Sequence, residues 1–288
     1  MSLDDVVTRC AVDDGLYLPT IRRHSLEKIG IHNRYAELFA TAIQAKWPQR
    51  AYLGLYAGAG RARLANTTEI VETSAMSVLR QRHPFTHHIF VDDNRDCLQA
   101  LERRAGAVGR SSDCTFIHGD VNAATALIRA ALPSFSREKG LLSFCFVDPF
   151  DIKLKFATIR ALSDRRMDFL VLLMLGGDAR RNLRMYTEDE SSTLVADFID
   201  RPDWRREYRA ESDRSIVRFL ARKFDEAMVS LGYLAANDEC RLRVTAAGTN
   251  VLQYVLVFYS QNALGQKLWK AAREGISPQL GLGLNGYR

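Results

Sequence analysis

The sequence predicts an α/β fold with a mostly parallel sheet that ends in an antiparallel hairpin. Short apolar runs alternate with segments of helical periodicity along most of the 288 residues. Such alternation is typical of right-handed crossovers between parallel strands that are covered on both faces. Near the end the alternation stops, because two β-rich runs, 241–248 and 251–260, follow each other directly. Adjacent runs of this kind predict a hairpin.

Five apolar runs are the predicted parallel strands: 51–58, 87–93, 114–120, 141–150 and 168–175. The segments between them are helical, as in 94–109, where Leu98, Leu101 and Ala105 recur at helical spacing. Five parallel strands followed by a hairpin is the strand order of the Rossmann-like class I methyltransferase fold. A plain dinucleotide-binding domain more often continues with another βα unit.

Two helical segments lie outside this strand order. We expect residues 1–50 to be an N-terminal helical extension, in which 24–46 carries the apolar stripe of an amphipathic helix. Residues 51–288 would then be the methyltransferase-like domain. A helical insertion is expected at about 176–235, and its clearest helix ends at Gly232.

Composition narrows the class of protein. The net charge of +6, carried mainly by arginine, is compatible with a nucleic-acid partner and equally with an ordinary solvated surface. Five cysteines without a C-x-x-C pair argue against a disulfide framework and a zinc site, so we expect no metal and a cytoplasmic location. The longest apolar run, 169–175, is too short to span a bilayer, and the first ten residues lack a signal-peptide pattern.

The stretch 52–64, YLGLYAGAGRARL, runs from a predicted strand into a G-x-G loop. Such a loop lets backbone approach a ligand closely, so Tyr56, Ala57, Gly58 and Gly60 are candidate cofactor residues, and we expect a helix to begin directly after them. A phosphate-binding loop is excluded, because the chain has no Gly-Lys-Ser or Gly-Lys-Thr. Arg63 stands where the NAD fingerprint has its third glycine, which weakens an NAD(P) oxidoreductase without removing it.

Three aspartates follow consecutive predicted strands at intervals of 28 residues: Asp92, Asp120 and Asp148. One βα unit separates each from the next, so all three should lie at the carboxyl edge of the sheet, where ligands bind. Asp92, with its neighbour Asp93, is placed to accept the hydroxyls of a ribose, and Asp120 to accept an adenine amino group. Each also has a plain structural explanation, because aspartate commonly caps a following helix. The three together favour S-adenosylmethionine as cofactor.

The motif Asp148-Pro149-Phe150 resembles the [DNS]-P-P-[YFW] motif of amino-directed methyltransferases, without the second proline. There the polar residue aligns an amine with the methyl group and the aromatic ring stacks on a base. Asp-Pro is also a common turn. These three residues are the candidate catalytic residues. A group of arginines that follows the fifth strand is placed to meet phosphates: Arg180, Arg181 and Arg184.

From about Asp14 to about Arg273 the chain resembles the three-Cys-motif partner protein (TcmP) family. The matching pieces are DDGLYLP, HSLEKIGIHNRYAELF, YAGAGRAR, FVDD, HGDVN, FCFVDPFD and LQYVLVFYSQNALGQKLW. The resemblance implies an S-adenosylmethionine-binding fold and a partner protein with a three-cysteine motif, similar to radical enzymes. It places Lys28, a further candidate cofactor-binding residue, at the lysine of a WSxxK-like motif, with His24 at the tryptophan position. Asp151 departs from the family's usual DPFG.

The leading hypothesis is therefore an S-adenosylmethionine-dependent methyltransferase whose acceptor is a nucleobase amine or a nucleotide-like compound. The cofactor residues that the resemblance supports are Gly58, Gly60, Asp92 and Asp120, with the Asp148 motif at the active edge. The alternative is a non-enzymatic Rossmann-like subunit that binds the three-Cys-motif protein, which the incomplete motif favours.

Overall fold

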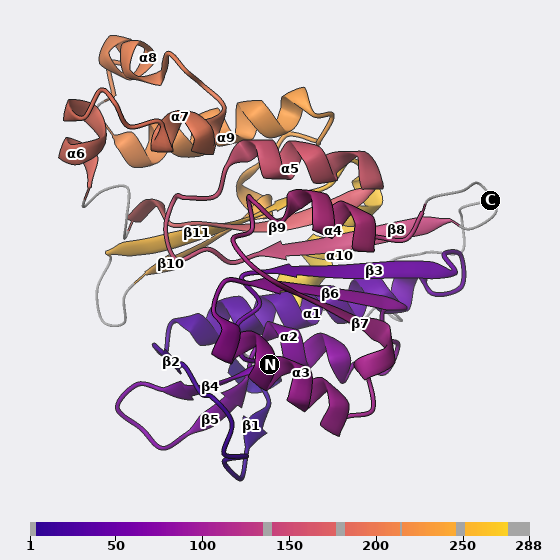
Figure 1. Cartoon of the computed structure of the whole chain (residues 1–288). Coiled ribbons are helices and arrows are strands. Elements are labelled where there is room, and N and C mark those ends of the chain that lie inside the picture. The colour runs from indigo at the N-terminus through magenta and orange to yellow at the C-terminus, as the bar shows by residue number, and fades with distance from the viewer. Residues whose placement is uncertain (1–3, 135–139, 177–181, 214, 246–250, 276–288) are drawn as a thin grey trace.

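The computed structural model describes residues 4–134, 140–176, 182–213, 215–245 and 251–275. Within them, a seven-stranded sheet with the order β10-β11-β9-β8-β3-β6-β7 forms the centre of the molecule (Figure 1). Its strands are β3 (Gln49–Leu55), β6 (His87–Asp92), β7 (Cys114–His118), β8 (Leu141–Val147), β9 (Met167–Leu173), β10 (Arg241–Thr245) and β11 (Leu252–Tyr259).

The pairing of these strands confirms the predicted class I methyltransferase fold. Strands β7, β6, β3, β8 and β9 pair in parallel, and β11 pairs antiparallel with both β9 and β10. The chain builds outward from β3 to β7 and then returns to place β8 on the other side of β3. This reversal is the topological switch point of an open α/β sheet, beside which ligands bind at the carboxyl ends of the strands.

Helices cover both faces of the sheet (Figure 1). One face is covered by α1 (Ser25–Ile43), α2 (Ser74–Leu79), α3 (Arg95–Ala107) and α10 (Ala263–Glu274). The other face is covered by α4 (Thr125–Ala131), α5 (Phe156–Leu162), α6 (Leu183–Glu188), α7 (Leu194–Ile199), α8 (Trp204–Ala210) and α9 (Ile216–Ser230). Successive residues of β3 pack alternately against the two helical layers. Leu53 packs in the layer that contains α5, and Tyr52 packs in the layer that contains α1.

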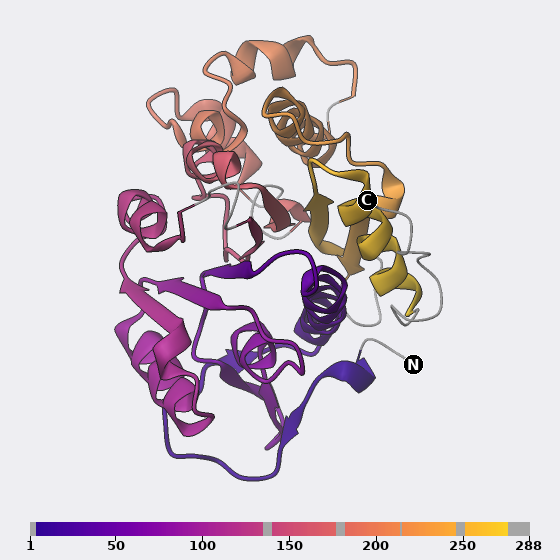
Figure 2. The same ribbon diagram turned by 90° about the vertical axis from the view of Figure 1, so that its right-hand side faces the viewer.

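The N-terminal amphipathic helix is confirmed as α1. Its apolar stripe is buried: Ile29, Ile31, Tyr35, Leu38, Phe39 and Ile43. The helix lies beside α10 against the sheet, as Figure 2 shows. The Tyr35 hydroxyl also donates a hydrogen bond of 2.8 Å to the buried Asp168 carboxylate on β9. Helix α1 therefore belongs to the hydrophobic core of the sheet.

Asp168 should give the protein a specific pH dependence. Burial raises the pKa of this carboxyl to about 6 from 3.8, against the opposing hydrogen bonds of Ser260 and Tyr35. The folded state then holds the proton more tightly than the unfolded state, so the stability that Asp168 contributes is fully present below about pH 4 and is lost as pH rises through about 6. Relative to Asp168→Asn, the wild type should lose about 3 kcal/mol across this window. Urea denaturation of both proteins at a series of pH values measures the difference, and parallel pH curves would contradict the assignment.

The segment expected to be a helical insertion contains α6 to α9, at the opposite end of the molecule from the small N-terminal sheet (Figures 1 and 2). The predicted helix stop at Gly232 is confirmed, because its φ of +86° requires the left-handed region beyond the end of α9. Among the described residues, no helix is long and apolar enough to cross a membrane.

The prediction that a helix begins directly after the G-x-G loop is wrong. The loop leads instead into β4 (Arg61–Leu64), which pairs with β5 (Ile70–Glu72), and α2 begins only at Ser74. The cause is the alternation in RARL, where Ala62 and Leu64 are buried and the arginines are half-buried, as in a strand. Two strands from residues 1–50 complete this small sheet: β1 (Arg9–Cys10) and β2 (Thr20–Ile21).

Candidate functional site

The glycine loop at the end of β3 has an unusual backbone. Tyr56, Gly58 and Gly60 all have positive φ, at 62°, 66° and 80°. A left-handed tyrosine is strained, and such strain gathers at functional sites. Neither the Ala59 nor the Gly60 N–H group has a hydrogen-bond partner among the described residues. Successive backbone N–H groups in such a loop form a concave site for an anionic group.

The two loop glycines should respond differently to substitution. A Cβ at Gly60 would lie 2.8 Å from both Leu101 Cδ1 and Met76 Cγ, whereas a Cβ at Gly58 would meet nothing within 4 Å. Gly58→Ala should therefore cost about 1 kcal/mol of stability, from backbone strain alone. Gly60→Ala should cost about 2–3 kcal/mol, because repacking is added to the strain. Urea denaturation measures both, and equal losses would contradict the close approach at Gly60.

Asp92 holds this loop in place. It is buried, its Oδ2 accepts a 2.7 Å hydrogen bond from the Gly58 N–H, and its Oδ1 accepts one of 2.9 Å from the Asn94 N–H. Burial raises the pKa of Asp92, and these hydrogen bonds oppose the shift. The next carboxylate, Asp93, is exposed and has no partner for its side chain among the described residues. Asn94 is the N-cap of α3, accepting a hydrogen bond from the Cys97 N–H. Asp93 is thus the acid of this pair that remains available to a ligand.

Asp120 combines the two roles that its position suggests. Its Oδ1 accepts hydrogen bonds from the N–H groups of Asn122 (3.0 Å) and Ala123 (2.9 Å) in the turn before α4. The residue is exposed, and its Oδ2 has no partner among the described residues. It therefore shapes the turn with one oxygen and can still accept a hydrogen bond with the other.

The carboxyl edge around Tyr56 is acidic. Burial is the main cause that raises the pKa of the Tyr56 phenol, and the carboxylates of Asp120, Asp151, Asp93 and Asp92 raise it further. The ends of β6 and β7 supply Asp92, Asp93 and Asp120, and the loop after β8 supplies Asp151, so the acids come from both sides of β3. A cationic ligand is favoured there, and a polyphosphate is disfavoured.

Directly after β8, Asp148 forms an ion pair with Lys28. The Lys28 Nζ atom lies 2.6 Å from Asp148 Oδ1 and 2.7 Å from Oδ2, although α1 and the end of β8 are 120 residues apart. The ammonium also lies 5.9 Å from the centre of the Tyr254 ring. Pro149 is buried, whereas Phe150 is 85% exposed. The structure thus unites the candidate catalytic motif with the lysine that the family resemblance singled out.

A cleft of about 580 Å³ lies beside this ion pair. Its walls come from β2, the start of α1, the loop after β8, the end of β9 and the start of β11. Its lining includes Arg22, His24, Lys28, Phe150 and Tyr254. Its size is in the range of small-molecule sites.

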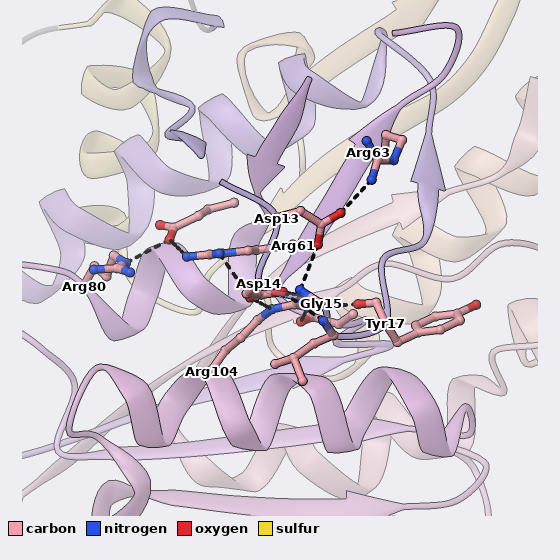
Figure 3. A network of polar contacts seen from close by, with 11 residues as sticks. Asp13, Asp14, Gly15, Tyr17, Arg61, Arg63, Arg80 and Arg104 are labelled. Carbon is pink, nitrogen blue, oxygen red and sulfur yellow. Dashed lines mark hydrogen bonds and ion pairs between the residues drawn. The ribbon is translucent and has the colours of Figure 1, made fainter. Parts of the chain in front are cut away.

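A segment near the N-terminus is fastened to the glycine loop through Arg104 (Figure 3). The buried Arg104 of α3 binds Asp14 with two hydrogen bonds, of 2.7 Å and 2.8 Å, and this contact is the main cause that lowers the pKa of Asp14 to about 2. The same guanidinium donates to the carbonyls of Ala59 (2.6 Å) and Tyr17 (3.1 Å). Arg104 therefore fixes the loop residue Ala59 and the segment that lies over it.

Further ion pairs connect the same N-terminal segment to the small sheet. Asp14 Oδ2 also lies 3.1 Å from Arg61 on β4, and Arg63 on the same strand pairs with Asp13 at 2.8 Å (Figure 3). The buried Glu72 of β5 lies between Arg61 (3.6 Å) and Arg80 (2.9 Å). The strand that replaced the expected helix thus anchors the segment through both of its arginines.

Asp14 and Arg104 are not among the site residues predicted from the sequence. A signal was present, because Arg104 lies within the apolar stripe of Leu101 and Ala105, where a charge must find partners when buried. The arginines expected to meet phosphates are not placed: Arg180 and Arg181 lie outside the described residues, as does the Arg184 side chain.

No family model and no curated protein matches the chain. Solved structures with some likeness include the O-methyltransferase TomG from Streptomyces achromogenes in complex with SAM, at 14% identity and a TM-score of 0.46, covering 80% of this chain and 79% of that one. Cofactor-bound Rv0187 from MTB has 14% identity and a TM-score of 0.45, over 90% and 87% of the two chains. An O-methyltransferase from Bacillus cereus in complex with SAH has 10% identity and a TM-score of 0.44, over 82% and 86%.

Proposed function

We propose that the chain is an S-adenosylmethionine-dependent methyltransferase whose acceptor is a nucleobase amine or a nucleotide-like compound. The observation that carries the proposal is the combination at the switch point of two unpaired loop N–H groups with the acids around Tyr56. The N–H groups of Ala59 and Gly60 suit the single carboxylate of the cofactor, and the acids suit its positively charged groups. NAD and nucleoside triphosphates carry phosphates that the same acids would repel.

The exposed acids fit the remaining parts of this cofactor. Asp93 is available to accept the two ribose hydroxyls, while Asp92 keeps Gly58 in position. The second oxygen of Asp120 is available to accept the adenine amino group. When bound, S-adenosylmethionine supplies the electrophilic methyl group. The chain itself needs only to bind and align the acceptor, so the residues of the cleft carry the specificity.

The Lys28–Asp148 ion pair and the exposed Phe150 ring support the proposed class of acceptor. Lys28 holds the Asp148 carboxylate at the mouth of the cleft, and a carboxylate has further lone pairs with which to accept a hydrogen bond from an amine. Phe150 exposes its ring at the same place, where a flat base can stack on it. A planar ligand that stacks on Phe150 would bury its apolar ring, and this burial favours binding.

Methyl transfer to cell-extract fractions tests this function. Wild-type protein with methyl-labelled S-adenosylmethionine should label an RNA, DNA or nucleotide fraction. Asp148→Ala should slow the labelling about 30-fold or more, whereas Asp164→Ala, which removes an exposed carboxylate at the opposite edge, should not. Labelling confined to protein or lipid would contradict the proposed acceptor.

One observation favours a non-enzymatic subunit that binds a three-Cys-motif protein. Both oxygens of Asp148 already contact Lys28, so the motif is stable as a structural contact without any acceptor. Under this second candidate, Asp148→Ala would leave cofactor binding and association with the partner unchanged. Copurification of the wild type and the variant with the co-expressed partner measures this, and loss of association in the variant only would exclude a passive role for Asp148.

A further inference from the structure

The cleft beside Asp148 is lined by basic side chains. Its lining residues include Arg22, His24 and Lys28, and none of the described residues that line it is an aspartate or a glutamate. Asp148 contacts Lys28 and is not among the lining residues. Arg22 is exposed, and no described residue pairs with its guanidinium. Arg22 is therefore the unpaired cation among the described lining residues, while the carboxylates of Asp148 and Glu27 act on Tyr254 in the same cleft.

Arg22 and Lys28 both lie close enough to His24 to act on its ring. Burial lowers the pKa of His24, and the charges of Lys28 and Arg22 lower it further. The imidazole ring of His24 in turn lies 5.9 Å from the Tyr254 ring. Arg22 and Lys28 thus lie near His24 at the start of α1, and because Lys28 is paired with Asp148, Arg22 is the cation that an entering anion would neutralise.

This charge is opposite to that around Tyr56. Carboxylates surround Tyr56, whereas the cleft is lined by the unpaired Arg22 and by Lys28, whose charge Asp148 compensates. This separation of charge favours two ligands of opposite charge. The acids around Tyr56 repel an anionic ligand, and the basic residues of the cleft repel a cationic one. Under the proposed function, the cationic cofactor takes the acidic side, so the acceptor takes the basic side.

The apolar part of the lining indicates a planar group on the same ligand. Pro149, Phe150, Leu172, Met174 and Tyr254 line the cleft. Phe150 exposes its ring almost completely. A ligand that satisfies both parts carries a flat ring and an anionic group, as a nucleotide does and a nucleoside does not.

We propose that the cleft recognises its acceptor by a phosphate group bound by Arg22 and Lys28, with the attached base against Phe150. This inference rests on the proposed function and restricts its acceptor to phosphate-bearing nucleotides. The phosphate can belong to a free nucleotide or to a nucleotide within a strand, since both present the same charge. Arg22 is the specificity residue, because Lys28 is already bound to Asp148.

Calorimetry on the full chain, saturated with S-adenosylhomocysteine, compares each nucleoside with its monophosphate: adenosine with AMP, and cytidine with CMP. At least one monophosphate should bind about tenfold or more tightly than its nucleoside, the gain expected from a charge-assisted hydrogen bond. A short single-stranded oligonucleotide that binds more tightly than the monophosphate identifies a strand as the source, and equal affinities identify the free nucleotide.

Arg22→Gln should remove this preference, leaving the nucleoside affinity unchanged. The matched control is Arg82→Gln, which removes the same charge from an exposed residue before β6, at the opposite edge of the sheet. The inference is overturned if nucleoside and monophosphate bind equally, or if Arg22→Gln weakens monophosphate binding no more than Arg82→Gln. If S-adenosylhomocysteine itself does not bind, the proposed function fails, whereas the monophosphate preference is still measured on the protein alone.

Discussion

Arg104→Met is expected to lower the free energy of unfolding by about 3 kcal/mol, the usual cost of removing one partner of a buried ion pair. The substitution leaves Asp14 without its two shortest hydrogen bonds and the carbonyls of Ala59 and Tyr17 without their donor. Because Ala59 belongs to the glycine loop, affinity for S-adenosylhomocysteine should also fall, by about tenfold or more. Urea denaturation and calorimetry below the unfolding transition measure the two effects separately.

Two control variants distinguish the loop contact from a general loss of charge on α3. Arg103→Met removes the exposed neighbouring arginine and should change neither quantity. Arg104→Lys keeps the charge but loses the planar fork that reaches Asp14 and both carbonyls, so it should recover only part of the stability. Cofactor affinity that stays at the wild-type value in folded Arg104→Met would show that the Ala59 contact does not position the loop.

Lys28→Met and Asp148→Asn are each expected to slow methyl transfer about 30-fold, and the double variant should be no slower than either single variant. Lys28 and Asp148 are both largely buried, with 16% and 18% of their side chains exposed, so each single change leaves the partner without its counter-charge. A hydrogen bond to a charged group is worth about 2 kcal/mol, which corresponds to that factor. The two changes should therefore be strongly non-additive.

The readouts of this cycle separate positioning from folding. Affinity for S-adenosylhomocysteine should change less than about threefold in all three variants, because neither residue contacts the glycine loop. Lys28→Arg should keep part of the transfer rate, since it retains a charge that can reach Asp148. Rates that multiply in the double variant would show that Lys28 and Asp148 act independently.

The parallel strands and the hairpin could be predicted because each is an uninterrupted apolar run bounded by turn residues. The same rule failed after the glycine loop, where a four-residue strand, Arg61–Leu64, was too short to be distinguished from the first turn of a helix. The alternation of buried and half-buried residues in this segment identifies a strand only when its pairing with β5 on one side and β2 on the other is known. Strand β2 comes from a segment about 40 residues earlier in the chain, and such pairing leaves no local pattern.

The candidate site was predictable in its positions and not in its contacts. Regular spacing placed Asp92, Asp120 and Asp148 at one edge of the sheet, because parallel strands end together. The partners of these acids depend on how distant segments dock. Lys28 reaches Asp148 from a helix 120 residues away, and only the family resemblance pointed to that lysine. Asp92 is buried and holds Gly58, whereas Asp93 is exposed, a difference that spacing in the sequence does not reveal.

Binding of S-adenosylhomocysteine to the purified chain is the most direct test of the central claim, that the glycine loop and the acids around Tyr56 hold this class of cofactor. Calorimetry should show one site, with binding weakened in Gly60→Ala and in Asp93→Asn. NADH and ATP, whose phosphates the acidic edge repels, should not compete. Failure of S-adenosylhomocysteine and S-adenosylmethionine to bind at high protein concentration, or tight binding of NADH at the same site, would contradict the account.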